Sequence, residues 1–190
     1  MRIDVARSDR PEYAGVERAS QPDAIASLYR ENFQFVWRSL RRLGVADRSL
    51  DDAVQDVFLV AHRKLSEYEG RASHRGWLFG IARHMAREYR RRDGRLALDE
   101  LALSRAAGPT RDIPELRRQV DLLDHLLSAL QEDQRAVFVM AEIEGFSAPE
   151  IAEVLGIKLN TAYSRLRLAR SRFERALSRH RKQTASEVKP

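Results

Sequence analysis

Residues Phe146–Phe173 are "FSAPEIAEVLGIKLNTAYSRLRLARSRF", a stretch that predicts two short helices on either side of a tight turn. Ser147 and Glu150 match the S-x-x-E capping box, which predicts a helix that starts directly after Ser147. Gly156 is placed to end that helix, and Asn160 is the expected N-cap of the next one. This pattern is typical of a helix-turn-helix, whose second helix normally lies in the major groove of DNA.

The second of these helices is predicted to have an apolar side and a polar side. At about 100° per residue, one apolar stripe faces the core. Its members are Ala162, Leu166, Ala169, Phe173 and Leu177. The residues predicted to point away from the core are Ser164, Arg167, Leu168, Ser171 and Arg175. Small residues are expected to let the two helices cross closely, namely Ala152, Gly156 and Ala162.

The charge on the second helix is strongly unbalanced. From Ala162 to Lys182 there are eight Arg or Lys residues and one acid, Glu174. A solvated helix face normally balances its charges through pairs of residues four apart, and this segment has too few acids to do so. Binding to nucleic acid therefore explains the charge better than a plain solvated face, which stays the alternative.

The N-terminal half predicts a separate three-helix bundle from Asp23 to about Gly94. Apolar residues recur at helical spacing from Asp23, and Gly44 is placed to end the first helix. A second helix starts near Leu50, and a third carries Trp77 on its apolar stripe, where we expect it to pack in the core. Three helices that share apolar faces form one small bundle.

The whole chain is predicted to be all-α, with two small helical domains joined by a flexible linker. The bundle covers 23–95 and the helix-turn-helix domain covers 120–180. Gly and Pro residues interrupt the segment 96–119, which is the predicted linker and includes a possible short helix, Leu98–Leu103. The remaining segments, 1–22 and 181–190, are predicted to be flexible tails, the second of them basic.

Composition disfavours several classes of protein. The 190 residues contain no apolar run near the length of a membrane span, and the N-terminus has no apolar signal-peptide core. The absence of cysteine excludes disulfides and thiolate metal sites. There is no Gly-rich phosphate loop and no nucleophile elbow, so we expect no catalytic residue, metal or cofactor. The histidines have no metal-ligand spacing: His62, His74, His84, His125 and His180.

The motifs of both halves, taken in order, resemble a known family. "LYRENFQFVWRSLRRLG", "DDAVQDVFLVAHRKL" and "YEGRASHRGWLFGIARHMAREYRRR" precede the linker, and "LQEDQRAVFVMAEIEGFSAPEIAEVLGIKLNTAYSRLRLARSRF" follows it. This series resembles the bacterial sigma factors of the sigma-70 family. In particular it resembles the extracytoplasmic-function (ECF) subgroup, which keeps only conserved regions 2 and 4.

The resemblance implies that the chain binds core RNA polymerase through the clamp coiled coil and the flap. The second helix would dock on the clamp through an acidic and amide-bearing face, which suits a basic partner surface. The implied docking residues are Asp51, Asp52, Gln55 and Asp56. For Asp51 and Asp52 the alternative is that they complement the helix dipole.

The resemblance also implies that the loop Gly70–His74 and the helix after it recognise the promoter −10 element. There a base is turned out of the stack into a pocket. The implied residues are Arg71, Ala72, Ser73, His74, Arg83, His84, Arg87 and Arg91. His84 would face the loop at a position where the family often has asparagine. The arginines would contact the DNA backbone, together with Arg90 and Arg92.

The −35 element would be recognised by the helix-turn-helix. The implied residues are Asn160, Thr161, Tyr163, Ser164, Arg165, Arg167, Leu168 and Arg170. Of these, Arg165 lies nearer the core edge, where it would contact a phosphate. Tyr163 and Leu168 stand where arginine is frequent in the family, which puts the usual −35 sequence in doubt. Leu168 would either cover a thymine methyl group or pack on a neighbouring helix.

The expected function is therefore that of a sigma factor, which directs promoter-specific initiation in the bacterial cytoplasm. Expected partners are core RNA polymerase, promoter DNA and an anti-sigma factor, which would insert at the linker or between the domains. No small-molecule substrate and no membrane insertion are expected. The alternative is a stand-alone helix-turn-helix regulator, which would bind a palindromic operator without polymerase.

Overall fold

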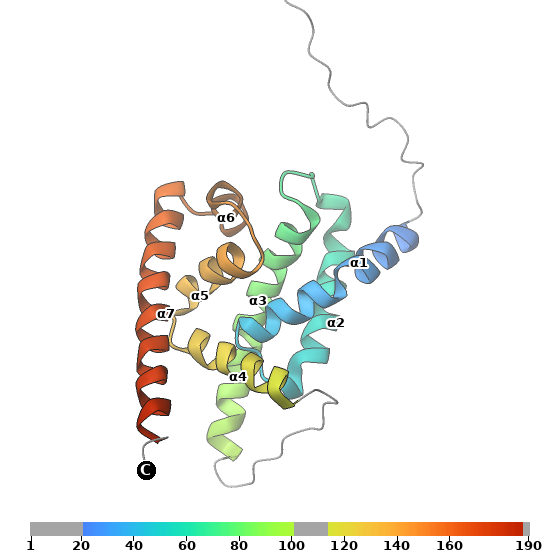
Figure 1. Ribbon diagram of the computed structural model, residues 1–190. Helices are drawn as coiled ribbons and strands as arrows, with labels where there is room; N and C mark the ends of the chain where they lie inside the picture. Colours follow the sequence, from blue (N-terminus) through green and yellow to red (C-terminus); the bar gives the residue numbers. More distant parts are fainter. Residues whose placement is uncertain (1–20, 101–113, 188–190) are drawn as a thin grey trace, which may run out of the picture.

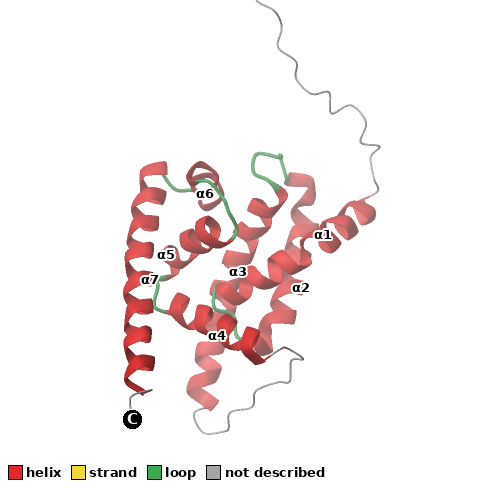
Figure 2. Cartoon of the chain, in the orientation of Figure 1, coloured by secondary structure: helices red, strands yellow, loops and turns green. Residues whose placement is uncertain are grey.

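The computed structural model describes residues 21–100 and 114–187. Within these ranges the regular elements are all helices, as the sequence predicted, and no strand occurs (Figure 2). They form two groups, an N-terminal bundle of α1 to α3 and a C-terminal bundle of α4 to α7 (Figure 1). The two groups pack against each other through α1 and α3.

The N-terminal bundle has three long helices, as expected. They are α1 (Gln21–Arg42), α2 (Leu50–Lys64) and α3 (His74–Glu100). Short 3-10 turns, η1 (Asp47–Ser49) and η2 (Leu65–Glu67), lie at the two ends of α2. Gly44 follows the end of α1 with a φ of +91°, a conformation that glycine adopts without steric cost.

The C-terminal bundle contains α4 (Pro114–Ser128), α5 (Glu132–Phe138), α6 (Ala148–Leu155) and α7 (Leu159–Glu187). A π-helical turn, η3 (Val139–Ile143), continues α5. Together, α6 and α7 are the predicted helix-turn-helix, and α7 lies along one side of the molecule (Figure 1).

The capping box predicted at the start of α6 is confirmed. The Ser147 backbone N–H donates to Glu150 Oε2 at 2.7 Å, and the Glu150 N–H donates to Ser147 Oγ at 3.5 Å. Gly156 ends α6 with a φ of +62°, as predicted. The close-crossing role expected for Gly156 is wrong, because a Cβ built there would meet no atom within 4 Å. Its left-handed backbone is what requires glycine.

The predicted N-cap of α7 is wrong. The helix begins at Leu159, one residue before Asn160, and the backbone N–H groups of Thr161 and Ala162 both donate to the Lys158 carbonyl. The turn is therefore tighter than the sequence pattern indicated. The apolar stripe of α7 is predicted correctly at its first three positions, since Ala162, Leu166 and Ala169 are buried.

Helix occupies both ends of the segment 96–119, which was predicted as a linker. Here α3 runs on to Glu100, and α4 begins at Pro114, a residue that the first turn of a helix tolerates. Residues 101–113 lie outside the described ranges, as do 1–20 and 188–190, and so does part of the short helix expected at Leu98–Leu103. Helix α7 continues through most of the predicted C-terminal tail.

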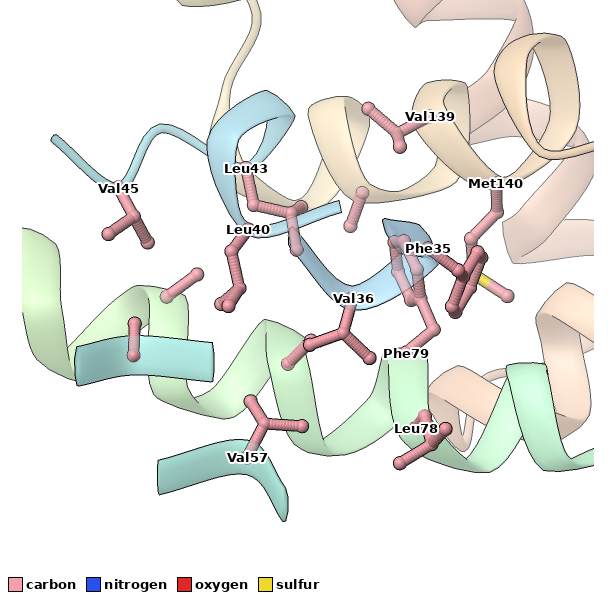
Figure 3. Close-up of a cluster of buried hydrophobic side chains, with 14 of the residues drawn as sticks. Phe35, Val36, Leu40, Leu43, Val45, Val57, Leu78, Phe79, Val139 and Met140 are labelled. Carbon is pink, nitrogen blue, oxygen red and sulfur yellow. The ribbon is translucent and has the colours of Figure 1, made fainter. Parts of the chain in front are cut away.

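One apolar core runs through both bundles. Phe35 and Val36 on α1 and Phe79 on α3 are buried in the same cluster as Val139 and Met140 of η3. Figure 3 shows Met140 next to Phe35 and Phe79. Because the cluster draws its side chains from both predicted domains, the two domains form one packed body in this structure.

Phe79 is a critical packing residue because it is completely buried where the two bundles meet. The variant Phe79→Ala should lower the free energy of unfolding by about 3–5 kcal/mol, because apolar burial is lost and a cavity remains. Chemical denaturation followed by circular dichroism measures this change. The control Leu59→Ala removes a side chain that is 45% exposed, and should cost less than about 1 kcal/mol. Equal losses in the two variants would contradict the assignment.

Candidate nucleic-acid interface

The N-terminal half of α7 presents a polar, exposed face. The exposed residues predicted to contact DNA are Asn160, Tyr163, Ser164, Arg167, Leu168 and Arg170, and Thr161 is half-buried. The aromatic side chain of Tyr163 is 54% exposed and the apolar side chain of Leu168 is 45% exposed. This face therefore combines polar side chains with two large exposed apolar ones.

Two arginines of α7 form ion pairs with acids of other helices, which the count of charges along α7 did not indicate. Arg165 forms an ion pair of 2.8 Å with Asp133 of α5, and Arg170 forms one with Glu142 of η3. The acids that balance this helix therefore come from other elements, and the pattern along the helix itself contained no sign of them. Arg167 is exposed and forms no ion pair with any described residue.

The loop between η2 and α3 is held in a defined shape. The Tyr68 hydroxyl donates to the Ala72 carbonyl, which closes the loop, and Gly70 has a φ of +70°. The Ser73 hydroxyl accepts from the Gly76 N–H at 3.1 Å at the start of α3. Ser73 therefore caps the helix, a role that the sequence analysis did not assign to it.

A pocket of about 720 Å³ lies beside this loop. Its wall includes Arg71, Ala72 and His84, so His84 and the loop border the same pocket. Trp77 also lines the pocket, with its ring centroid 4.9 Å from that of Tyr68. The prediction that Trp77 is a core residue is therefore only partly correct, since it is half-buried. Volume and aromatic lining both suit a planar ligand.

The arginines that follow on α3 are paired with carboxylates. Arg83 forms an ion pair with Asp133 at 2.8 Å, and Arg87 forms one with Glu132 at 3.1 Å. Arg91 pairs with Glu88 on its own helix at 2.7 Å. Arg71, in the loop, pairs with Glu69. Each of these arginines of the predicted −10 set therefore has a carboxylate partner within its own chain.

The predicted docking face on α2 divides into two parts. Asp51, Asp52 and Gln55 are exposed in the first turns of α2. Asp56 is half-buried and accepts a hydrogen bond of 2.6 Å from the Tyr89 hydroxyl of α3. Burial and this bond raise the pKa of Tyr89 to about 12. Asp56 thus has an internal partner, which the sequence pattern did not indicate.

Comparison with known proteins identifies the family. The model of "Sigma-70 region 2" matches residues 28–96, and that of "Sigma-70, region 4" matches residues 121–173. The RNA polymerase sigma factor YlaC of Bacillus subtilis is 30% identical over 166 residues, which cover 85% of this chain and 96% of YlaC. The chain belongs to the sigma-70 family. Other relatives are named ECF RNA polymerase sigma factors, and this sigma factor is of that subgroup.

Two solved structures are similar to this sigma factor. A structure of CnrH in complex with the cytosolic domain of CnrY has a TM-score of 0.64 and 25% identity, covering 82% of this chain and 88% of that one. The sigma factor RpoE in complex with the anti-sigma factor NepR from Bartonella quintana has a TM-score of 0.58 and 26% identity, covering 79% and 96%.

This sigma factor has a second basic surface, whose residues the sequence pattern did not group into one site. A groove of about 520 Å³ lies along the C-terminal half of α7. Its lining residues are Ala129, Arg172, Arg175, Ser178, Arg179 and Lys182. At helical spacing, Arg172, Arg175 and Arg179 continue the face that carries Leu168. That spacing is the signal from which the groove was predictable.

The described residues of this sigma factor contain no cluster of ligands suited to a metal ion. In the same ranges, no helix is long and apolar enough to cross a membrane.

The raised pKa of Tyr89 leads to a prediction at alkaline pH. The folded-state pKa of about 12 lies above the ordinary value of 10.0. The protonated Tyr89 hydroxyl therefore contributes to the stability of the folded state in full below pH 10, and this contribution is lost as the pH rises toward 12. An ultraviolet titration of tyrosinate should show one group that ionises near pH 12, and Tyr89→Phe should remove that step. If the step persists in the variant, the assignment to Tyr89 is wrong.

Proposed function

We propose that this sigma factor directs core RNA polymerase to promoters by binding a −10 and a −35 element, with no catalytic role of its own. The main support for this proposal is that one chain presents two separate surfaces suited to DNA. One is the pocket beside α3, and the other is the exposed polar face of α7. Core RNA polymerase is a cytoplasmic machine, so we place the action of this chain in the bacterial cytoplasm.

At the −35 element, α7 would lie in the major groove with its N-terminal residues toward the base edges. Arg167 is the best candidate for a base contact because its guanidinium is exposed and forms no ion pair within the described ranges. Leu168 and Tyr163 supply apolar contact, of the kind that suits a thymine methyl group. Arg172 and Arg179 in the basic groove would contact backbone phosphates further along.

At the −10 element, the pocket beside the loop 70–74 would receive an unstacked base. Tyr68 and Trp77 offer aromatic rings for stacking, and His84 offers a ring nitrogen that donates or accepts one hydrogen bond. The side chain of Arg71 is 78% exposed and would contact a phosphate. Imidazole differs in geometry from the carboxamide common at this position in the family, so the preferred base should differ too.

Polymerase would dock on the exposed first turns of α2. Asp51, Asp52 and Gln55 are exposed there, and their side chains form no hydrogen bond or ion pair with another described residue that would compete with a partner. Asp56 contributes less directly, because its carboxylate already accepts from Tyr89. We also propose an anti-sigma partner, which the complexes of CnrH with CnrY and of RpoE with NepR support by analogy.

Run-off transcription tests the proposed function directly. Core polymerase with this chain should initiate on a library of genomic promoters, and core polymerase alone should not. The variant Asp51→Lys/Asp52→Lys should lose initiation through lost docking while keeping its affinity for DNA. A stand-alone regulator predicts the opposite pattern, namely tight binding to a palindromic operator and no initiation with any promoter.

The two kinds of arginine should differ in their effect on promoter choice. Arg167→Ala should weaken binding to the −35 element by roughly 1–3 kcal/mol and reduce discrimination between promoters, because a base contact is lost. Arg91→Ala should weaken binding to all sequences alike. Competition binding with promoter variants, measured on the complex with polymerase, separates the two effects. If Arg167→Ala discriminates between promoters as well as the unaltered chain does, Arg167 has no role in base recognition.

A further inference from the structure

Among the described residues, the ion pairs between the two bundles all have the same polarity. Arginines of α1 and α3 face carboxylates of the C-terminal bundle. We call the first set the arginine face and the second set the acidic face. The arginine face consists of Arg41, Arg42, Arg75, Arg83, Arg87 and Arg90. The acidic face consists of Asp121, Asp124, Glu132, Asp133 and Glu144.

Two carboxylates of the acidic face each bridge two arginines of the arginine face. Glu144 lies 2.8 Å from both Arg42 and Arg75, and its side chain is only 3% exposed. Glu132 lies 3.1 Å from Arg87 and 2.9 Å from Arg90. Little water screens the pairs of the enclosed Glu144, whereas Glu132, with 32% of its side chain exposed, remains partly solvated.

A third carboxylate, Asp133, connects the two proposed DNA-binding surfaces. One of its oxygens lies 2.8 Å from Arg83 of α3, and the other lies 2.8 Å from Arg165 of α7. Both arginines are in the sets implied to contact DNA. A single acid thus occupies one cation from the −10 surface and one from the −35 surface.

Apolar contacts between the two bundles hold the arginine face against the acidic face. Gly76 of α3 lies so close to Val154 of α6 that a Cβ on the glycine would be 2.9 Å from Val154 Cγ2. Phe35 on α1 has its ring centroid 6.5 Å from that of Phe146. Val154 and Glu153 also form part of the wall of the pocket beside the −10 loop. The C-terminal bundle therefore lies against the N-terminal DNA surface itself.

We propose that the acidic face competes with promoter DNA for the arginines of α3. While the two bundles are packed together, its carboxylates occupy these arginines. A phosphate and a carboxylate are alternative partners for the same guanidinium groups, so DNA must displace Glu132 and Asp133 to bind Arg83 and Arg87. Separation also uncovers the apolar contact at Phe35 and Met140, which a partner such as polymerase would cover. This inference rests on the proposed role of α3 in DNA binding.

Glu132→Gln is the sharpest variant, because Glu132 pairs with Arg87 and Arg90 of α3 and with no arginine of α7. The probe is a fluorescein-labelled pool of random single-stranded DNA, and its affinity for the free full-length chain is measured by anisotropy. Glu132→Gln should bind roughly three to ten times more tightly than the unaltered chain, the scale of one or two partly exposed ion pairs. Arg87→Ala in the same background should remove the gain.

Glu174→Gln is the matched control. It makes the same change in net charge on an exposed site of α7, outside the contact between the bundles, and it should raise affinity less than about twofold. Equal gains in Glu132→Gln and Glu174→Gln would overturn the inference and leave the DNA-binding role intact. No binding by any variant would overturn the role of α3, and the inference with it.

A distance measurement tests the packed arrangement without altering either face. The chain has no cysteine, so Ser66→Cys/Ser171→Cys gives two exposed labelling sites, one in each bundle. Spin labels on the free protein should give one narrow distance distribution, which broadens to longer distances when the DNA pool is added. A broad distribution in the free protein, or one that DNA leaves unchanged at saturation, would overturn the inference.

Discussion

The apolar contact between α1, α3 and η3 is the feature on which the rest of the arrangement depends. Phe35 and Phe79 of the N-terminal bundle are buried in one cluster with Met140 of the C-terminal bundle, and burial of this kind supplies the non-directional part of the attraction. Without it, the ion pairs around its edge would be largely solvated, and solvated pairs contribute little. With it, Glu144 is enclosed between two arginines and the carboxylates of α5 meet α3. Packing thus decides which charges meet.

The same contact connects the two surfaces of this sigma factor that we propose to bind DNA. The pocket beside the −10 loop takes part of its wall from α6, the first helix of the helix-turn-helix. Asp133 links α3 to α7 through one carboxylate. Regions that have separate tasks in the proposed function are therefore physically coupled in this arrangement. Any partner that separates them changes the electrostatics of both surfaces at once.

Much of the local structure was predictable because it depends on neighbours in the sequence. The capping box at Ser147, the left-handed turn at Gly156 and the buried stripe beginning at Ala162 all follow from spacing within one or two helical turns. The start of α7 was predicted two residues too late, because Asn160 is a good N-cap by type, while the turn closes through the Lys158 carbonyl and the helix begins at Leu159. The partners of Arg83, Arg87 and Arg165 were not predictable, since their acids lie tens of residues away along the chain.

The sequence by itself determined that this protein is all-α, that it has a helix-turn-helix near its C-terminus, and that its motifs resemble those of ECF sigma factors. Each of these rests on periodicity or short-range spacing, which a linear pattern records. Only the tertiary structure decided that the cations of α3 face carboxylates of another bundle and that Trp77 borders a pocket. It also decided that Asp56 accepts from Tyr89. These contacts depend on how two helical faces pack, and steric fit between distant segments decides that packing.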